Sequence, residues 1–103
     1  MNEIEFLSKN EKDKFKNEIQ EIDLSCRLNI TACKLKLEDY DLVIYECNKI
    51  LQIKENWKAH YRAGISYFKK GKFKQSLHHL EKSKALNPSS DDKSSKFFSL
   101  NNS

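Results

Sequence analysis

The hydrophobic positions in the second half of the chain recur at the spacing of α-helices. They form two series that are separated by Gly71. The first series is Trp57, Ala59, Ala63 and Tyr67, and the second is Phe73, Leu77, Leu80 and Leu86, with Lys84 at one of its positions. Gly71 has the backbone freedom that a tight turn between antiparallel helices needs, and Pro88 ends the second helix because proline has no N–H. Residues 56–88 therefore predict one helical hairpin.

A second hairpin is predicted immediately before this one. Apolar residues recur near a 3.6-residue period from Phe15 to Leu37 with no Gly or Pro, which predicts one long helix of about seven turns over residues 11–37. Ser8-x-x-Glu11 and Asn10-x-x-Asp13 are both capping-box patterns at its start. A new series begins at Tyr40 and predicts a helix over 40–53, followed by helices over 57–70 and 73–87. The expected fold class is all-α, with no strand.

The two hairpins align with each other at a 33-residue register. Five pairs define the alignment: Asn29 with Arg62, Ala32 with Ile65, Lys36 with Lys69, Tyr40 with Phe73, and Lys49 with Lys82. The order of small, glycine, aromatic and proline positions in residues 56–88 resembles the 34-residue tetratricopeptide repeat (TPR), in which small residues such as Ala63, Ser76 and Ser83 let two helices approach closely. The resemblance implies an α-helical superhelix, with repeat one at about 24–55 and repeat two at about 56–88 inside a TPR domain of 11–88.

Composition and charge narrow the classes of function. The chain has 103 residues, of which 33% are charged, and no apolar run suits a membrane span or a signal peptide, so a single cytoplasmic domain is expected. Residues 56–88 carry eight basic residues and one acid, which favours an anionic partner or, alternatively, a solvated lysine face. The three cysteines, Cys26, Cys33 and Cys47, lack metal-ligand spacing and are expected to be reduced and buried.

One face of the predicted helices is basic. In TPR arrays the first helix of each hairpin lines a concave groove. Helical spacing places Lys58, Arg62 and Lys69 on the groove side of one such helix. The repeat alignment places Asn29 and Lys36 at the equivalent positions of the other. Asn29 and the Lys58-x-x-x-Arg62 pair resemble the carboxylate-clamp TPRs of chaperone partners. That resemblance implies binding of the acidic Glu-Glu-Val-Asp C-terminus of ninety- or seventy-kilodalton heat-shock chaperones, for which amide, ammonium and guanidinium groups are suitable donors.

The motifs LNITACKLKLEDYD, ECNKIL and KAHYRAG look most like the TPR region of large immunophilins. The resemblance covers residues 12–88, and only three of the usual five clamp positions are carried over, because residues 1–10 are too short for a preceding repeat. No isomerase domain is present, so isomerase activity does not transfer. The alternative function is a TPR scaffold that binds another protein or self-associates through the apolar residues of the long helix, Phe15, Ile19 and Ile22.

Other chemistry is not indicated by the sequence. No nucleophile, acid–base pair, metal set or cofactor motif is recognised, so neither an enzyme nor a cofactor is expected. Nucleic-acid binding is disfavoured because the groove lacks interleaved aromatic residues. His60, His78 and His79 are expected at the surface or in packing between helices, and Trp57 as an anchor between helices. Residues 89–103 are expected to form a flexible tail or a short capping helix.

Overall fold

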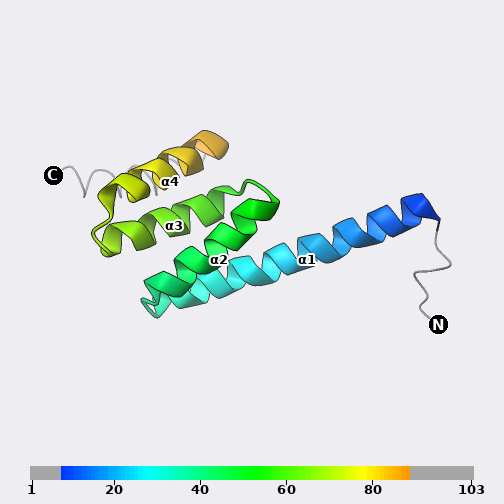
Figure 1. Cartoon of the computed structure of the whole chain (residues 1–103), viewed down its shortest axis with the longest axis horizontal. Coiled ribbons are helices and arrows are strands. Elements are labelled where there is room, and N and C mark those ends of the chain that lie inside the picture. The colour runs from blue at the N-terminus through cyan, green and yellow to red at the C-terminus, as the bar shows by residue number, and fades with distance from the viewer. Residues whose placement is uncertain (1–7, 89–103) are drawn as a thin grey trace.

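The computed structural model describes residues 8–88 of the chain, and these residues form four helices without a strand. The helices are α1 (Lys9–Lys36), α2 (Tyr40–Ile53), α3 (Trp57–Lys69) and α4 (Phe73–Leu86). They pack as two successive antiparallel hairpins, α1 with α2 and α3 with α4, as Figure 1 shows. The expected all-α class is confirmed, and every predicted boundary is correct to within two residues. The expectations for residues 1–7 and 89–103 lie outside the described residues.

Side-chain caps fix most of the helix starts. The side chain of Ser8 accepts a hydrogen bond from the Glu11 N–H at 3.2 Å, so α1 begins two residues earlier than predicted. Asp39 caps α2 and Asn56 caps α3 in the same way. Lys72 precedes α4 without a side-chain cap. Three of the four helix starts are therefore encoded by local polar residues.

The 33-residue register is visible in the backbone. Helix α1 ends at Lys36 and α3 ends at Lys69, while α2 and α4 occupy equivalent ranges of the two hairpins. Both turns contain one residue in the left-handed region, Glu38 with φ 61° and Gly71 with φ 78°. Because glycine adopts this region without steric cost, the second turn is the less strained of the two.

The core lies between α1, α2 and α3. It contains Val43, Cys47 and Ile50 from α2 with Leu24, Ala59 and Ala63 from its neighbours. Helix α4 joins through Leu80 and the buried serines Ser76 and Ser83, whose hydroxyl groups donate to the Gly64 and Trp57 carbonyls at 2.7 and 2.9 Å. The predicted apolar face of α4 is wrong in part: Phe73, Leu77 and Leu86 are 57%, 46% and 46% exposed. Leu80 and the two serines, rather than Phe73, Leu77 and Leu86, make the close contact with α3.

Candidate peptide-binding groove

A groove of about 380 Å³ lies between the first helices of the two hairpins. Helix α1 contributes one wall and α3 the other. The lining residues are Ala32, Leu35, Lys36, Trp57, Lys58, Tyr61 and Arg62. Three of them are cations and none is an acid, so the groove combines an apolar floor with positive charge. Such a surface suits an anionic group that is attached to an apolar chain.

Arg62 is the most constrained of the three cations. It is half-buried, and its Nη1 donates hydrogen bonds to the Leu28 carbonyl at 2.8 Å and to Thr31 Oγ1 at 3.1 Å. The Thr31 hydroxyl donates in turn to the same carbonyl at 2.7 Å. These contacts tie α3 to α1, and they use only one of the guanidinium nitrogens. The remaining N–H groups of the fork are available for an oxyanion.

The charge of Arg62 has no carboxylate partner within residues 8–88. The recorded ion pairs of this part of the chain involve Arg27, Lys54, His60 and Lys70 instead. Burial lowers the pKa of Arg62 from its ordinary value, although a guanidinium stays charged at neutral pH. A partly desolvated cation without a counter-ion attracts an anion more strongly than a solvated cation does.

Lys58 and Lys36 lie at the edge of the groove, where they are exposed. The Lys58 ammonium lies 5.8 Å from the centre of the Trp57 ring, within the range of a cation–π contact. Trp57 therefore lines the groove as well as beginning α3. Exposed lysines of this kind are free to reorient toward a ligand, in contrast to Arg62.

The five residues expected to bind peptide from the sequence do not all line this groove. Lys36, Lys58 and Arg62 are brought together. Asn29 is exposed on α1, three residues before Ala32, and is not among the lining residues. Lys69 is exposed at the end of α3, about two turns beyond Arg62, and is also outside the lining. The groove lining thus includes three of the five residues predicted from the sequence.

Sequence reasoning missed Thr31, Leu35 and Tyr61. Thr31 is fully buried and supplies one of the two oxygens that hold Arg62. In the repeat alignment Thr31 corresponds to Gly64. A polar threonine in place of glycine was the available signal in the sequence. Leu35 and Tyr61 provide the apolar surface of the groove, and their spacing from Ala32 and Lys58 was the available signal.

The histidines form a cluster that the sequence did not predict. His60 is only 4% exposed, and its Nδ1 lies 2.9 Å from Nδ1 of His79, while its Nε2 lies 3.0 Å from Glu55 Oε2. The turn before α3 brings Glu55 to His60. Burial lowers the pKa of His79 to about 4, with a smaller contribution from His60. Within residues 8–88 no group of three or more ligands is arranged to hold a metal ion.

The expected burial of the cysteines is correct for one residue only. Cys47 is completely buried, and burial raises its thiol pKa to about 12. Cys26 and Cys33 are exposed on α1, contrary to the expectation, because nothing in the described chain covers that side of the helix. All three are free thiols.

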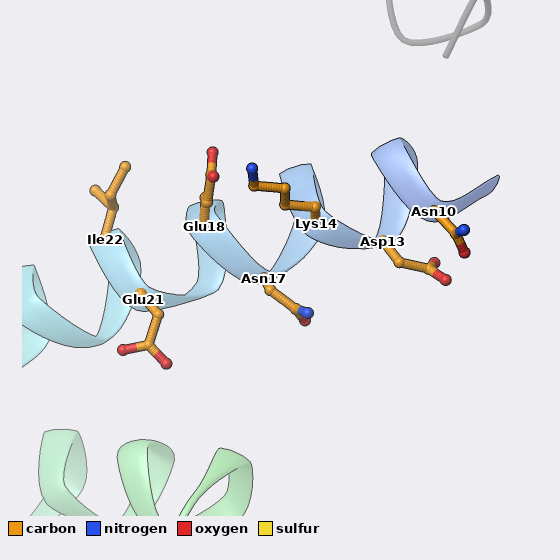
Figure 2. Close-up of a pocket in the computed structure, with 7 residues that line it drawn as sticks. All are labelled: Asn10, Asp13, Lys14, Asn17, Glu18, Glu21 and Ile22. Carbon is orange, nitrogen blue, oxygen red and sulfur yellow. The ribbon is translucent and has the colours of Figure 1, made fainter. Parts of the chain in front are cut away.

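A second hollow, of about 710 Å³, lies along the first half of α1. All seven lining residues come from that one helix and all are exposed, as Figure 2 shows. Glu21 and Ile22 project to opposite sides of the helix there. This hollow is an open surface without converging groups, and we assign no ligand to it. None of the helices between residues 8 and 88 is long and apolar enough to cross a membrane.

Comparison with known proteins agrees with the helical repeat. Residues 57–90 match the family model for the tetratricopeptide repeat, so α3 and α4 form a TPR. The TPR resemblance drawn from the sequence is thus confirmed for the second hairpin.

The chain also resembles part of one curated protein. Over 61 residues the chain is 43% identical to FK506-binding protein 5 of Rhizopus delemar, an alignment that covers 58% of this chain and 16% of that protein. The resemblance to the TPR region of immunophilins is confirmed, although the chain spans only a small part of the relative's length. No solved structure matches the chain significantly.

Proposed function

We propose that the groove between α1 and α3 binds the acidic C-terminus of a partner protein, of the Glu-Glu-Val-Asp type carried by heat-shock chaperones. In this proposal the chain acts as a co-chaperone-like module in the cytoplasm, through a partial carboxylate clamp. The similarity to FK506-binding protein 5 and the carboxylate-clamp pattern of Asn29, Lys58 and Arg62 support this choice of partner.

One observation carries the proposal: Arg62 is half-buried at the groove without an acidic partner in the described chain, beside Lys36 and Lys58. The hydrogen bonds to Leu28 and Thr31 hold the guanidinium in a fixed orientation before any ligand arrives. Preorganisation of this kind reduces the entropy that binding costs. The free N–H groups of Arg62 then bind one carboxylate while the two lysines bind neighbouring acids.

Asn29 and Lys69 have a secondary part in this proposal. They lie outside the groove lining, so they contact only those peptide residues that extend beyond it. Alanine at Asn29 or Lys69 should weaken a short peptide less than alanine at Lys58.

The test compares alanine variants by calorimetric titration with an Ile-Glu-Glu-Val-Asp peptide. Arg62→Ala is expected to weaken binding by roughly 1.5–3 kcal/mol, and Lys58→Ala by roughly 0.2–1 kcal/mol because Lys58 is exposed. Arg62→Ala also removes contacts between α1 and α3, so Lys58→Ala and Lys36→Ala are the cleaner probes of the groove. Far-UV circular dichroism verifies that each variant is folded.

Lys82→Ala is the matched control, because Lys82 is an exposed lysine on α4 and outside the groove. It should leave the affinity unchanged, while added salt should weaken the unmodified protein. Equal losses for Lys58→Ala and Lys82→Ala would mean that the basic hairpin attracts the peptide diffusely and that the groove is not the site.

A further inference from the structure

The guanidinium of Arg62 has two edges on which a carboxylate can accept a pair of parallel hydrogen bonds. One edge joins Nη1 to Nη2, and the other joins Nε to Nη2. The protein already uses Nη1, which donates to the Leu28 carbonyl at 2.8 Å and to Thr31 Oγ1 at 3.1 Å. Within residues 8–88 no hydrogen bond or ion pair engages Nε or Nη2. The Nε–Nη2 edge is therefore the edge that the described chain leaves wholly free.

The free edge of Arg62 is also accessible to solvent. Among the described residues that are not exposed, Ser66 Oγ is the one side-chain nitrogen or oxygen that is sealed from solvent without a hydrogen-bond partner. Nε and Nη2 have no partner in this part of the chain, so solvent must reach both atoms. Arg62 lines the groove between α1 and α3, beside Lys58 and Tyr61. The edge can therefore receive a ligand without loss of a hydrogen bond within the described chain.

The orientation of this guanidinium depends on Thr31. The Thr31 side chain is fully buried, and its hydroxyl donates to the carbonyl of Leu28, three residues earlier in α1, at 2.7 Å. The lone pairs of Thr31 Oγ1 are then left for Arg62, which can only donate. Arg62 Nη1, Thr31 Oγ1 and the Leu28 carbonyl thus form a closed ring of three hydrogen bonds between α3 and α1. This ring holds Nη1 against α1 and restricts the rotation of the guanidinium.

We infer that a carboxylate of the acidic peptide binds side-on to the Nε–Nη2 edge of Arg62, and that Thr31 is the positioning residue for this contact. The inference rests on the peptide-binding function proposed above and adds which donor atoms make the contact. Thr31 is buried and does not touch the ligand. It acts through Arg62, because it keeps Nη1 on α1 and leaves the other edge to the groove. Ordering one long side chain in advance is worth roughly two- to tenfold in affinity.

The lysines of the groove do not provide an equivalent contact. Lys36 and Lys58 are exposed, and an ammonium is a point charge without a planar pair of donors. They attract acidic side chains but do not fix the direction from which a carboxylate approaches. Arg62→Lys would therefore keep the charge of the groove and remove the Nε–Nη2 edge.

Nuclear magnetic resonance of the arginine Nε–H groups tests the choice of edge. The chain contains two arginines, Arg27 and Arg62, so the isotope-labelled full chain has two such signals, and Arg62→Lys assigns them by removing one. A Met-Glu-Glu-Val-Asp peptide with a free C-terminus should shift the Arg62 Nε–H proton downfield and slow its exchange with water. Arg27 is the internal control, because its Nε already donates to Asp23 at 3.2 Å and its Nη1 to Glu46 at 2.8 Å. Its signal should stay in place.

Thr31→Val tests the positioning role. Valine has a similar shape but no hydroxyl, so the affinity for the same peptide, measured by Trp57 fluorescence, should fall by roughly two- to tenfold. Thr31→Ser keeps the hydroxyl and should retain most of the affinity. Ser76→Ala is the matched control, since it also removes a buried hydroxyl, one that donates to the Gly64 carbonyl at 2.7 Å where α3 packs on α4. It should leave the affinity unchanged, and far-UV circular dichroism verifies that each variant is folded.

The contrary results separate this inference from the proposed function. If the peptide binds while the Arg62 Nε–H signal stays in place, or while the Arg27 signal moves as far, the Nε–Nη2 edge is not the contact, although the groove still binds. Unchanged affinity in Thr31→Val, or equal losses in Thr31→Val and Thr31→Ser, would overturn the positioning role. Absence of binding to the unmodified protein would instead refute the proposed function, and this inference with it.

Discussion

Helices α3 and α4 approach closely at Gly64, and a side chain there has no room. A Cβ atom added to Gly64 would lie 2.7 Å from both Cγ and Cδ2 of Leu80 and 3.3 Å from the Leu80 backbone nitrogen. Leu80 is only 1% exposed, so its side chain has little space into which to rotate. The hydrogen bond from Ser76 Oγ to the Gly64 carbonyl, at 2.7 Å, also holds the two helices at this separation.

Two opposing effects determine the stability of Gly64→Ala. Alanine is favoured over glycine inside a helix by about 1 kcal/mol. Overpacking a close-packed contact costs about 1–3 kcal/mol. Because the contact is far below van der Waals distance and involves a buried side chain, we expect the overpacking to exceed the gain. The difference is a net loss of up to about 2 kcal/mol, which corresponds to a melting temperature lower by up to roughly 16 °C for a domain of this size.

The assay is urea unfolding of Gly64→Ala, Leu80→Val and the double variant. Leu80→Val removes part of the obstructing side chain, so Gly64→Ala should cost less in that background than in the unmodified protein. A positive coupling in the double-mutant cycle would identify the Gly64–Leu80 contact as the cause. Strictly additive effects, or a Gly64→Ala variant more stable than the parent, would refute the close approach of α3 and α4.

The remaining predictions concern buried polar groups and thiols. Ser83→Ala should lower the free energy of unfolding by about 1 kcal/mol, because it removes the hydrogen bond to the Trp57 carbonyl. Ser66→Ala should be neutral or stabilising, because Ser66 Oγ is buried without a hydrogen-bond partner within residues 8–88. The folded-state pKa of His79, about 4, is below its ordinary value of 6.5, so the unfolded chain takes up a proton first and stability should fall as pH drops from 6.5 toward 4. Solvent screens part of this effect at the half-buried ring, so urea unfolding should show a loss of about 1–2 kcal/mol that His79→Gln reduces. Thiol labelling of the folded protein should modify Cys33 rapidly and spare Cys47; equal rates would contradict the burial of α2.

Much of the fold follows from local sequence signals. The predicted range of α2 agrees with the structure at both ends, and Asp39 supplies a cap at its start. The 33-residue alignment also places Glu38 over Gly71, and both residues have positive φ. Caps and turn residues act over a few positions, so a sequence pattern is enough to locate them.

The faces of the terminal helices could not be predicted in the same way. Cys33 on α1 and Leu77 on α4 both follow an apolar period, yet both are exposed. Periodicity identifies which residues share a face, but it does not show whether another helix covers that face. Each of these helices is at one end of the described array, and the missing information is the neighbour rather than the helix itself.

The candidate site shows a similar limit. Helix spacing correctly suggested that Lys58 and Arg62 lie on one face, and the groove contains both. The hydrogen bonds from Arg62 to Leu28 and Thr31 depend on how α1 packs on α3, which no local pattern contains. Asn29 was predicted to bind peptide because the repeat alignment pairs it with Arg62. Such an alignment identifies the face of a helix, but it does not show how far a groove extends along that face.

Recognition of a free carboxylate is the central claim, and one titration tests it most directly. Trp57 is the sole tryptophan of the chain and lines the groove, so its fluorescence reports binding there. A Met-Glu-Glu-Val-Asp peptide with a free C-terminus should change the Trp57 emission saturably, and the same peptide with an amidated C-terminus should bind at least about tenfold more weakly, since one charge-assisted contact is lost. Equal binding of the two peptides, or no binding of either one, would contradict the proposed function.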